Sequence, residues 1–238
     1  MNYLENINPN YLDLMMPLQK WKILSVENLK SLSGFPGNVW NFYKAIRKLE
    51  QMELLKGFVD GFTNQKFLYL GEKGFKALGV EKIVPVHEEN RFHDAHLVRM
   101  LLQLKCLPFT EDVLLDQQIK KELPLLKHLP DAIISGRRKE KFLLAVELEL
   151  TQKSKERVRE AFSSYEASPY FNNVLYLFNR QTPYQTYQEV LKDYVEIRNK
   201  EKFLFLYEPM LTRRTYEILK SELTFKGRTT TLQEVFSV

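Results

Sequence analysis

Cysteine is almost absent from this sequence, and its scarcity excludes whole classes of protein. Among 238 residues only Cys106 is a cysteine, which excludes a disulfide framework and a cysteine-ligated zinc site. Its apolar neighbours favour a buried thiol. Glycine (9 residues) and proline (10) are also scarce, so collagen-like and linker-like chains are excluded. Hydrophobic residues at 44% and charged residues at 27% are typical of a folded globular protein.

Long apolar runs and long blocks of like charge are missing as well. No stretch approaches the ~18 apolar residues of a membrane-spanning helix, and the first residues lack the pattern of a signal peptide. We therefore expect a cytoplasmic protein with no membrane partner. The 35 basic and 30 acidic residues give a net charge of +5. This mildly basic balance is compatible with a nucleic-acid partner, which individually placed side chains would have to contact.

A polar segment over residues 81–90 divides the sequence. It follows Gly79, contains Pro85 and ends in acidic and amide side chains, which is typical of a linker between domains. The sequence therefore predicts two domains, residues 1–80 and residues 91–238, in agreement with the length of the chain.

The order of patterns before this linker predicts a winged helix-turn-helix. Three helices, two strands and a further helix are predicted in turn, at residues 12–21, 25–33, 38–52, 54–59, 66–70 and from residue 71. Ser25 is suited to cap the second helix. The segment from Phe67 to Gly74 resembles the second wing strand and the following turn of prokaryotic winged-helix domains, with Gly71 in place of the usual threonine.

The third predicted helix has two faces. At about 100° per residue, one side carries Val39, Phe42, Tyr43, Ile46, Leu49 and Glu53. Asparagine can pair with an adenine edge, and lysine or arginine can bind guanine or phosphate. We therefore interpret the polar positions of this helix and of the wing tip as DNA-binding, namely Asn41, Lys44, Arg47, Lys48, Asn64, Gln65 and Lys66. The alternative is an ordinary solvated helix face.

The sequence after the linker predicts an α/β domain with a central mixed sheet. Apolar strands are predicted at residues 112–116, 129–135, 142–150, 173–178 and 203–207. Helical patterns precede the first of these strands and follow the third and the fourth, at residues 91–104, after residue 154, and at residues 182–198.

Acidic residues gather at the ends of two neighbouring strands of this domain. Glu147 and Glu149 project from one face of a strand, because residues i and i+2 share a face. Asp131 begins the preceding strand, a hairpin away. Carboxylate oxygens are ligands that Mg²⁺ prefers, and Mg²⁺ can generate the hydroxide that attacks a phosphodiester. These acids predict a site for Mg²⁺ or Mn²⁺; the alternative is that both glutamates face solvent on a half-exposed strand.

This constellation resembles the PD-(D/E)XK nuclease-like superfamily. More closely, it resembles the replication-relaxation family of plasmids and mobile elements, which joins a winged helix to a nuclease-like domain. The segment Leu129–Ala132 matches the Pro-Asp motif of that family, and Val146–Ser154 matches its two alternate acids followed by a lysine. Asp116 stands where relatives often carry a glutamate. The resemblance implies a restriction-endonuclease-like α/β domain, with catalytic residues Asp131, Glu147, Glu149, Lys153 and Asp116 and metal ligands Asp131, Glu147 and Glu149.

The sequence departs from the superfamily at one position, and two functions remain open. The usual pair is a carboxylate, one spacer and a lysine, but Glu149 occupies the lysine position and Lys153 lies four residues further on. One expectation is a Mg²⁺-dependent endonuclease that acts on double-stranded DNA in replication, transfer or transposition. The alternative is a non-catalytic DNA-binding regulator or replication accessory protein, whose second domain serves dimerisation or DNA grip. Expected partners are double-stranded DNA, other replication or transfer proteins, and a second copy in a homodimer. A protein–protein adaptor is a third, weaker interpretation.

Overall fold

The computed structural model describes residues 8–80, 85–107, 109–137 and 139–236. Contacts divide the chain into two units, Met1–Arg99 and Met100–Val238, and the division falls within helix α6 (Arg91–Leu104). Residues 81–84 of the segment interpreted as a linker lie outside the described residues. In the part of the chain that the structure describes, no helix combines the length and the apolar character needed to cross a membrane.

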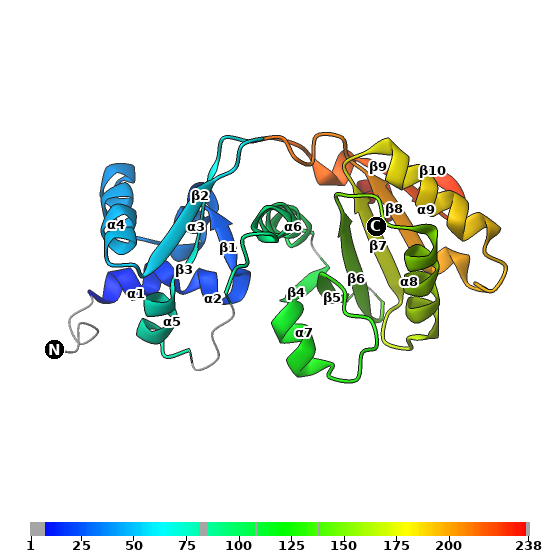
Figure 1. The fold of residues 1–238 in the computed structure, drawn as a ribbon, viewed down its shortest axis with the longest axis horizontal. Coiled ribbons are helices and arrows are strands. Elements are labelled where there is room, and N and C mark those ends of the chain that lie inside the picture. The colour runs from blue at the N-terminus through cyan, green and yellow to red at the C-terminus, as the bar shows by residue number, and fades with distance from the viewer. Residues whose placement is uncertain (1–7, 81–84, 108, 138, 237–238) are drawn as a thin grey trace. The chain divides into compact units, whose positions relative to one another are not determined.

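Short helices and a small antiparallel sheet make up the first unit (Figure 1). Its elements are α1 (Pro9–Met15), α2 (Pro17–Trp21), β1 (Ile23–Ser25), α3 (Val26–Ser33), α4 (Val39–Gln51), β2 (Leu55–Val59), β3 (Lys66–Leu70) and α5 (Glu72–Ala77). The sheet has three strands in the order β1-β3-β2. The single helix predicted over residues 12–21 is wrong, because Pro17 begins a second helix, a position that proline favours.

Side-chain caps fix the boundaries of the helices on either side of the turn. The Ser25 hydroxyl accepts a hydrogen bond from the Asn28 amide at 3.1 Å, which confirms the predicted cap of α3. Gly34 ends α3 in the left-handed region at φ 58°, where a side chain would be strained. The Asn38 side chain accepts a hydrogen bond from the Asn41 amide at 2.9 Å and caps α4. The start of α4 is therefore set locally, before its apolar face packs.

A mixed sheet of seven strands forms the second unit, in the order β10-β9-β8-β7-β6-β5-β4 (Figure 1). The elements after α6 are β4 (Thr110–Leu115), α7 (Asp116–Glu122), β5 (Ala132–Arg137), β6 (Lys141–Glu149), α8 (Lys155–Ala167), β7 (Asn173–Phe178), α9 (Gln181–Asp193), β8 (Phe203–Tyr207), β9 (Glu222–Phe225), β10 (Arg228–Thr231) and α10 (Leu232–Phe236). β6, β7 and β8 are parallel, and the other pairs are antiparallel. The predicted α/β class with a mixed sheet is confirmed. Cys106 is exposed in the turn after α6, so the prediction of a buried thiol is wrong.

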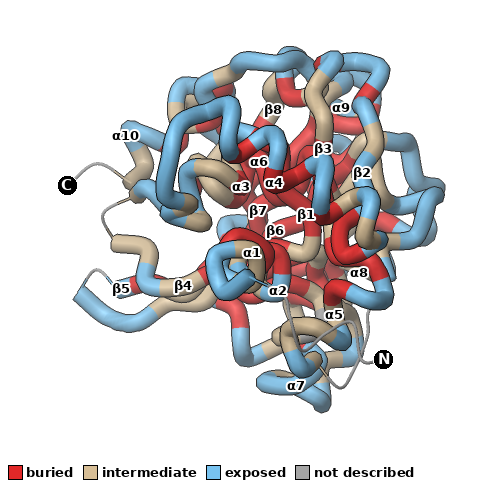
Figure 2. The backbone as a smooth tube through the Cα atoms, turned by 90° about the vertical axis from the view of Figure 1, so that its left-hand side faces the viewer, coloured by how far each residue is buried: buried red, intermediate tan, exposed pale blue. Residues whose placement is uncertain are grey.

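Aromatic rings fill the space between this sheet and the helices α8 and α9. Phe162 and Tyr165 from α8 lie with their ring centroids 5.6 and 6.3 Å from the ring of Tyr176 on β7. Tyr187 from α9 lies 5.3 Å from the same ring. All four rings are almost completely buried, and Figure 2 shows most of β6 and β7 coloured as buried. Rings packed at steep angles interact favourably through their edges and faces, so this layer holds both helices on one face of the sheet.

Candidate functional site

Asp131, Glu147 and Glu149 meet at the end of β6, and the two glutamates are buried. Glu147 and Glu149 are 5% and 2% exposed, on the face of the sheet that carries the aromatic layer. Asp131 comes directly before β5, and its Oδ2 accepts a hydrogen bond of 2.8 Å from the amide of Leu148. The Asp131 carboxylate therefore lies against the backbone between the two glutamates. The alternative that both glutamates face solvent is wrong, because α8 and α9 cover their face.

Glu147 has two protein partners in its buried position. The Tyr165 hydroxyl donates a hydrogen bond to Glu147 Oε1, and His128 Nε2 lies 2.9 Å from the same oxygen. Burial raises the pKa of Glu147, and the nearby charge of Asp131 raises it further. The hydrogen bonds from His128 and Tyr165 lower this pKa, but the net direction is upward.

Glu149 is paired with the lysine that follows the strand. Lys153 Nζ lies 2.6 Å from Glu149 Oε1, and the lysine side chain remains 42% exposed. Burial alone would lower the pKa of Lys153, but the charge of Glu149, followed by those of Glu147 and Asp131, leaves it raised. The ammonium group therefore lies in the electrostatic field of Asp131, Glu147 and Glu149. The structure brings Asp131, Glu147, Glu149 and Lys153 together.

Tyrosine hydroxyls complete the buried side of the cluster. Tyr187 forms a hydrogen bond with Glu149, whereas the Tyr176 hydroxyl is buried without a hydrogen-bond partner among the described residues. Burial, followed by the charges of the glutamates, raises the pKa of both tyrosines. Both phenols therefore remain protonated at neutral pH and can donate hydrogen bonds.

Three further residues lie near this end of the sheet: Asp116, which was predicted as a site residue, and His128 and Tyr187, which were not. Asp116 begins α7 directly after β4, and the pairing of Leu115 with Ala132 places it at the same sheet edge as Asp131. His128 and Tyr187 were not predicted as site residues. His128 lies outside any helix or strand, so no periodicity could indicate its direction; its only signal is its closeness to the Pro-Asp motif.

The carboxylates do not form a ready metal cage. Among the described residues, no three side chains of histidine, cysteine, aspartate or glutamate are arranged to hold a metal ion. Each acid instead has a partner within the protein: the Leu148 amide for Asp131, His128 and Tyr165 for Glu147, and Lys153 for Glu149. A bound ion would therefore have to compete with at least one of these contacts.

In the first unit, α4 presents the predicted polar face to solvent. Its buried stripe consists of Phe42, Ala45, Ile46 and Leu49, whereas Asn41, Lys44, Arg47 and Lys48 are exposed. The Lys44 ammonium lies 3.4 Å from the ring centroid of Trp40, which is 63% exposed. α4 therefore carries an exposed aromatic ring beside its cations.

The apolar stripe of α4 is narrower than predicted. Val39 and Tyr43 are 51% and 44% exposed, so their assignment to the inner face is wrong. The buried side chains of α4 are confined to positions in line with Phe42, Ile46 and Leu49. Glu53 lies beyond the end of α4, at φ 59°, and pairs with Lys73 at 2.6 Å rather than joining the inner face.

The loop between β2 and β3 has its own polar core. The buried carboxylate of Asp60 accepts hydrogen bonds from the amides of Phe62 and Thr63 at 3.2 and 3.0 Å. Asn64 is exposed in the left-handed region, and Gln65 is half-buried. Lys66 Nζ lies 2.7 Å from Glu50 at the end of α4, so this lysine connects β3 to the helix. Of the residues predicted at the wing tip, Asn64 is the one most open to a partner.

Comparison with known proteins adds no relative, because no family model and no curated protein matches this chain. Function has to be inferred from the residues and their geometry.

The raised pKa of Glu147 predicts a dependence of stability on pH. A carboxyl whose pKa is higher in the folded state contributes stability that is fully present below its unfolded pKa, about 4.3, and lost as the pH rises through the folded pKa. In Glu147→Gln, the glutamine does not ionise, so the variant does not lose this contribution to stability as the pH rises. In chelator-treated protein, we expect the variant to gain unfolding free energy relative to wild type between pH 4 and pH 7, as measured by denaturant titration.

Glu156 provides a control of opposite sign. Hydrogen bonds at the start of α8, first from backbone and then from Ser154, lower its pKa. Glu156→Gln should therefore lose stability relative to wild type over the same rise in pH. If Glu147→Gln instead loses stability relative to wild type as the pH rises, as Glu156→Gln does, the pKa of Glu147 is not raised by its burial.

Proposed function

We propose that this chain binds double-stranded DNA through α4 and hydrolyses a phosphodiester bond at the Asp131–Glu147–Glu149 cluster with the help of Mg²⁺ or Mn²⁺. The observation that carries the proposal is the position of Lys153, whose ammonium lies within the field of the clustered acids and is still partly exposed. A buried group of acids beside a solvent-accessible lysine is what the hydrolysis of a phosphodiester needs, since the acids can bind a cation and the lysine can bind the phosphate.

The order of elements supports the same proposal. Helices α1 to α4 followed by the β2–β3 hairpin suit a winged helix-turn-helix, and β1 adds a third strand to that hairpin. In the second unit, Asp131 directly precedes β5 and the glutamates lie on the adjacent strand β6, an arrangement that suits the nuclease-like domain of the replication-relaxation family. We propose this family relationship, with a role in the replication, transfer or transposition of a plasmid or mobile element.

The donor set suits a divalent cation, even though the acids are not already arranged as a cage. Mg²⁺ commonly binds through one or two carboxylates and fills its other positions with water and substrate phosphate. Asp131 and Glu147 would hold the ion, because the two carboxylates already interact electrostatically. The Tyr176 hydroxyl is buried beside the same acids and has no hydrogen-bond partner in the described part of the chain, so it can donate a hydrogen bond to a group bound there. When bound, the cation supplies a hydroxide nucleophile and neutralises charge on the phosphate.

The protein side chains have separate tasks in this proposal. Glu149 acts as a further ligand or as the base that accepts a proton from the attacking water. Lys153 leaves Glu149 and donates to a phosphate oxygen, which is feasible because its side chain is partly exposed. His128 and Tyr165 orient Glu147 through the hydrogen bonds that they form with its Oε1. Asp116 is the remaining acidic candidate at this edge.

One observation favours the non-catalytic alternative. Each acid has a partner within the protein, so the cluster is also stable without an ion. In that case the chain is a DNA-binding regulator or replication accessory protein, and its second unit serves dimerisation or DNA grip. Metal binding and cleavage distinguish the two candidates.

The exposed lysines of α4 give the first test of this proposal. Lys44→Ala with Lys48→Ala removes two cations from the surface proposed to bind DNA. We expect weaker binding to duplex DNA, and a salt dependence whose slope falls by about 0.9 for each phosphate that the variant no longer neutralises. Fluorescence anisotropy over a range of salt concentrations measures both. Lys120→Ala with Lys121→Ala, two exposed lysines of α7, is the matched control; equal effects of the two double variants would contradict a specific role for α4.

The acid cluster gives a second test, in two steps. Mg²⁺ or Mn²⁺ should raise the melting temperature of the wild type, because a ligand that binds only the folded state stabilises it. Asp131→Asn should abolish this increase, whereas Glu122→Gln, at an exposed acid of α7, should retain it. In the second step, Lys153→Ala should lose the nicking of supercoiled DNA while keeping the metal-induced shift. A Lys153→Ala protein that nicks DNA as fast as wild type would exclude the lysine from the reaction.

The Tyr176 hydroxyl gives a third test. A buried hydroxyl without a partner destabilises a protein by about 1–3 kcal/mol, so Tyr176→Phe should leave the metal-free protein as stable as wild type or more stable. If the hydroxyl serves the bound ion or its water, the same variant should show a smaller metal-induced rise in melting temperature.

Tyr184→Phe is the matched control. The Tyr184 hydroxyl bonds to Glu222 and Thr224 at 2.9 and 2.7 Å, so its removal should lower stability without changing the metal-induced shift. A Tyr176→Phe protein with the full shift would exclude Tyr176 from the site.

A further inference from the structure

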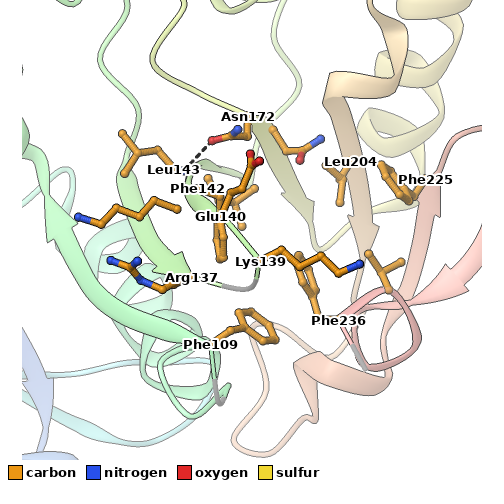
Figure 3. A pocket seen from close by; sticks show the side chains of 14 residues that line it. Phe109, Arg137, Lys139, Glu140, Phe142, Leu143, Asn172, Leu204, Phe225 and Phe236 are labelled. Atoms are coloured by element: carbon orange, nitrogen blue, oxygen red, sulfur yellow. Dashed lines mark hydrogen bonds between the residues drawn. The ribbon is translucent and has the colours of Figure 1, made fainter. Parts of the chain in front are cut away.

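The second unit contains a pocket at the end of β6 opposite the acid cluster (Figure 3). β6 runs from Lys141 to Glu149; its first residues line the pocket and its last carry the acids. The pocket has a volume of about 1000 Å³. It is bordered by the β5–β6 hairpin, the start of β7, β8, β9 and α10.

Half-buried phenylalanines form the walls of this pocket, namely Phe109, Phe142, Phe225 and Phe236. The ring of Phe109 stacks on Phe236 at a centroid distance of 5.1 Å and lies 6.0 Å from Phe142. Gly136 permits this arrangement, because a Cβ atom at that position would lie 2.4 Å from the Phe109 carbonyl oxygen and 2.5 Å from the ring of Phe142. The walls therefore present flat aromatic surfaces that the core leaves partly uncovered.

The rim of the pocket is basic. Arg137 is paired with Glu111 at 3.1 Å, whereas Lys139 and Lys141 have no ion-pair partner among the described residues. Figure 3 shows the Lys139 side chain extending across the pocket. Glu140 is the one acidic residue among the lining residues that the structure describes, against Arg137, Lys139 and Lys141, so the net charge of the lining is positive. A ligand that completes this rim is an anion.

Amide groups add hydrogen-bonding capacity. The Asn172 side chain accepts a hydrogen bond of 2.9 Å from the Leu143 amide through Oδ1, which fixes the side chain (dashed line in Figure 3). Its Nδ2 has no partner among the described residues and can donate to a ligand. Asn172 is exposed, so this donor lies at the mouth of the pocket, where a polar ligand can reach it. A planar heterocycle can both stack on phenylalanine and accept this hydrogen bond.

We propose that this pocket binds an unpaired nucleotide of single-stranded nucleic acid, with the base among the phenylalanine rings and the phosphate at Lys139 and Lys141. The inference goes beyond the proposed function, because it concerns a single strand and a surface remote from the acids along β6. It does not depend on whether the acid cluster binds a metal ion. A strand held here would add to duplex binding by α4.

The test uses the full chain in the presence of a chelator, with a short fluorescent oligothymidylate as the probe. The variant Lys139→Glu with Lys141→Glu should weaken binding of the probe about ten-fold or more and reduce its salt dependence. Phe236→Ala should weaken binding without reducing the salt dependence, since it removes only a stacking surface. Lys120→Glu with Lys121→Glu, the same charge change on α7, should leave the affinity for the probe within about two-fold of wild type.

Two further measurements separate this proposal from its alternatives. Lys44→Ala with Lys48→Ala should retain probe binding even if duplex binding is abolished. This variant therefore tests single-strand binding by the pocket separately from duplex binding by α4. A fluorescent fatty acid should not compete with the oligothymidylate. The proposal is overturned if the wild type does not bind the probe, if the two double charge reversals have equal effects, or if the fatty acid displaces the probe.

Discussion

The second unit depends on the burial of two glutamates beneath an aromatic layer. Glu147 and Glu149 lie on a strand whose neighbours on the same face are phenylalanine and tyrosine, and burial of an unpaired carboxylate is strongly unfavourable. The fold therefore has to supply partners: a histidine from the segment before β5, tyrosines from α8 and α9, and a lysine from the turn after β6. Side chains from several elements therefore meet at the end of β6, where they form hydrogen bonds and an ion pair with the buried carboxylates.

These partners also explain how a stable fold can retain a reactive site. A purely apolar strand end would fold without help from His128 or Lys153. Burial raises the pKa of both glutamates, and the charge of Asp131 raises that of Glu147 further while the charge of Glu147 raises that of Glu149. Both carboxylates therefore need compensating hydrogen-bond donors. Perturbed carboxylates beside a lysine are common at functional sites, although structural ion-pair networks perturb pKa values as well. Such a network does not account for the Tyr176 hydroxyl, which is buried beside the acids with no hydrogen-bond partner among the described residues.

Much of the fold followed from local patterns, and the exceptions have physical reasons. Apolar runs predicted β2, β3, β6 and β7, and helical periodicity predicted α4. The cap at Ser25 was predicted from residue type alone and is confirmed by the structure. β1 has three residues, too few for a pattern, and β9 and β10 are short and polar. At the site, a period of two placed Glu147 and Glu149 on one face, but it could not show that α8 and α9 cover that face. His128 reaches Glu147 through the path of an irregular segment, which no sequence pattern encodes.

The central claim is that the buried acids bind a divalent cation through Asp131 and Glu147. Isothermal titration calorimetry of Mg²⁺ and Mn²⁺ into the full chain tests it most directly, with Asp131→Asn measured beside wild type. The account predicts saturable binding of at least one of these ions by wild type and its loss in the variant. Absence of binding by wild type, or equal binding by both proteins, would contradict it and leave the acids as a structural network.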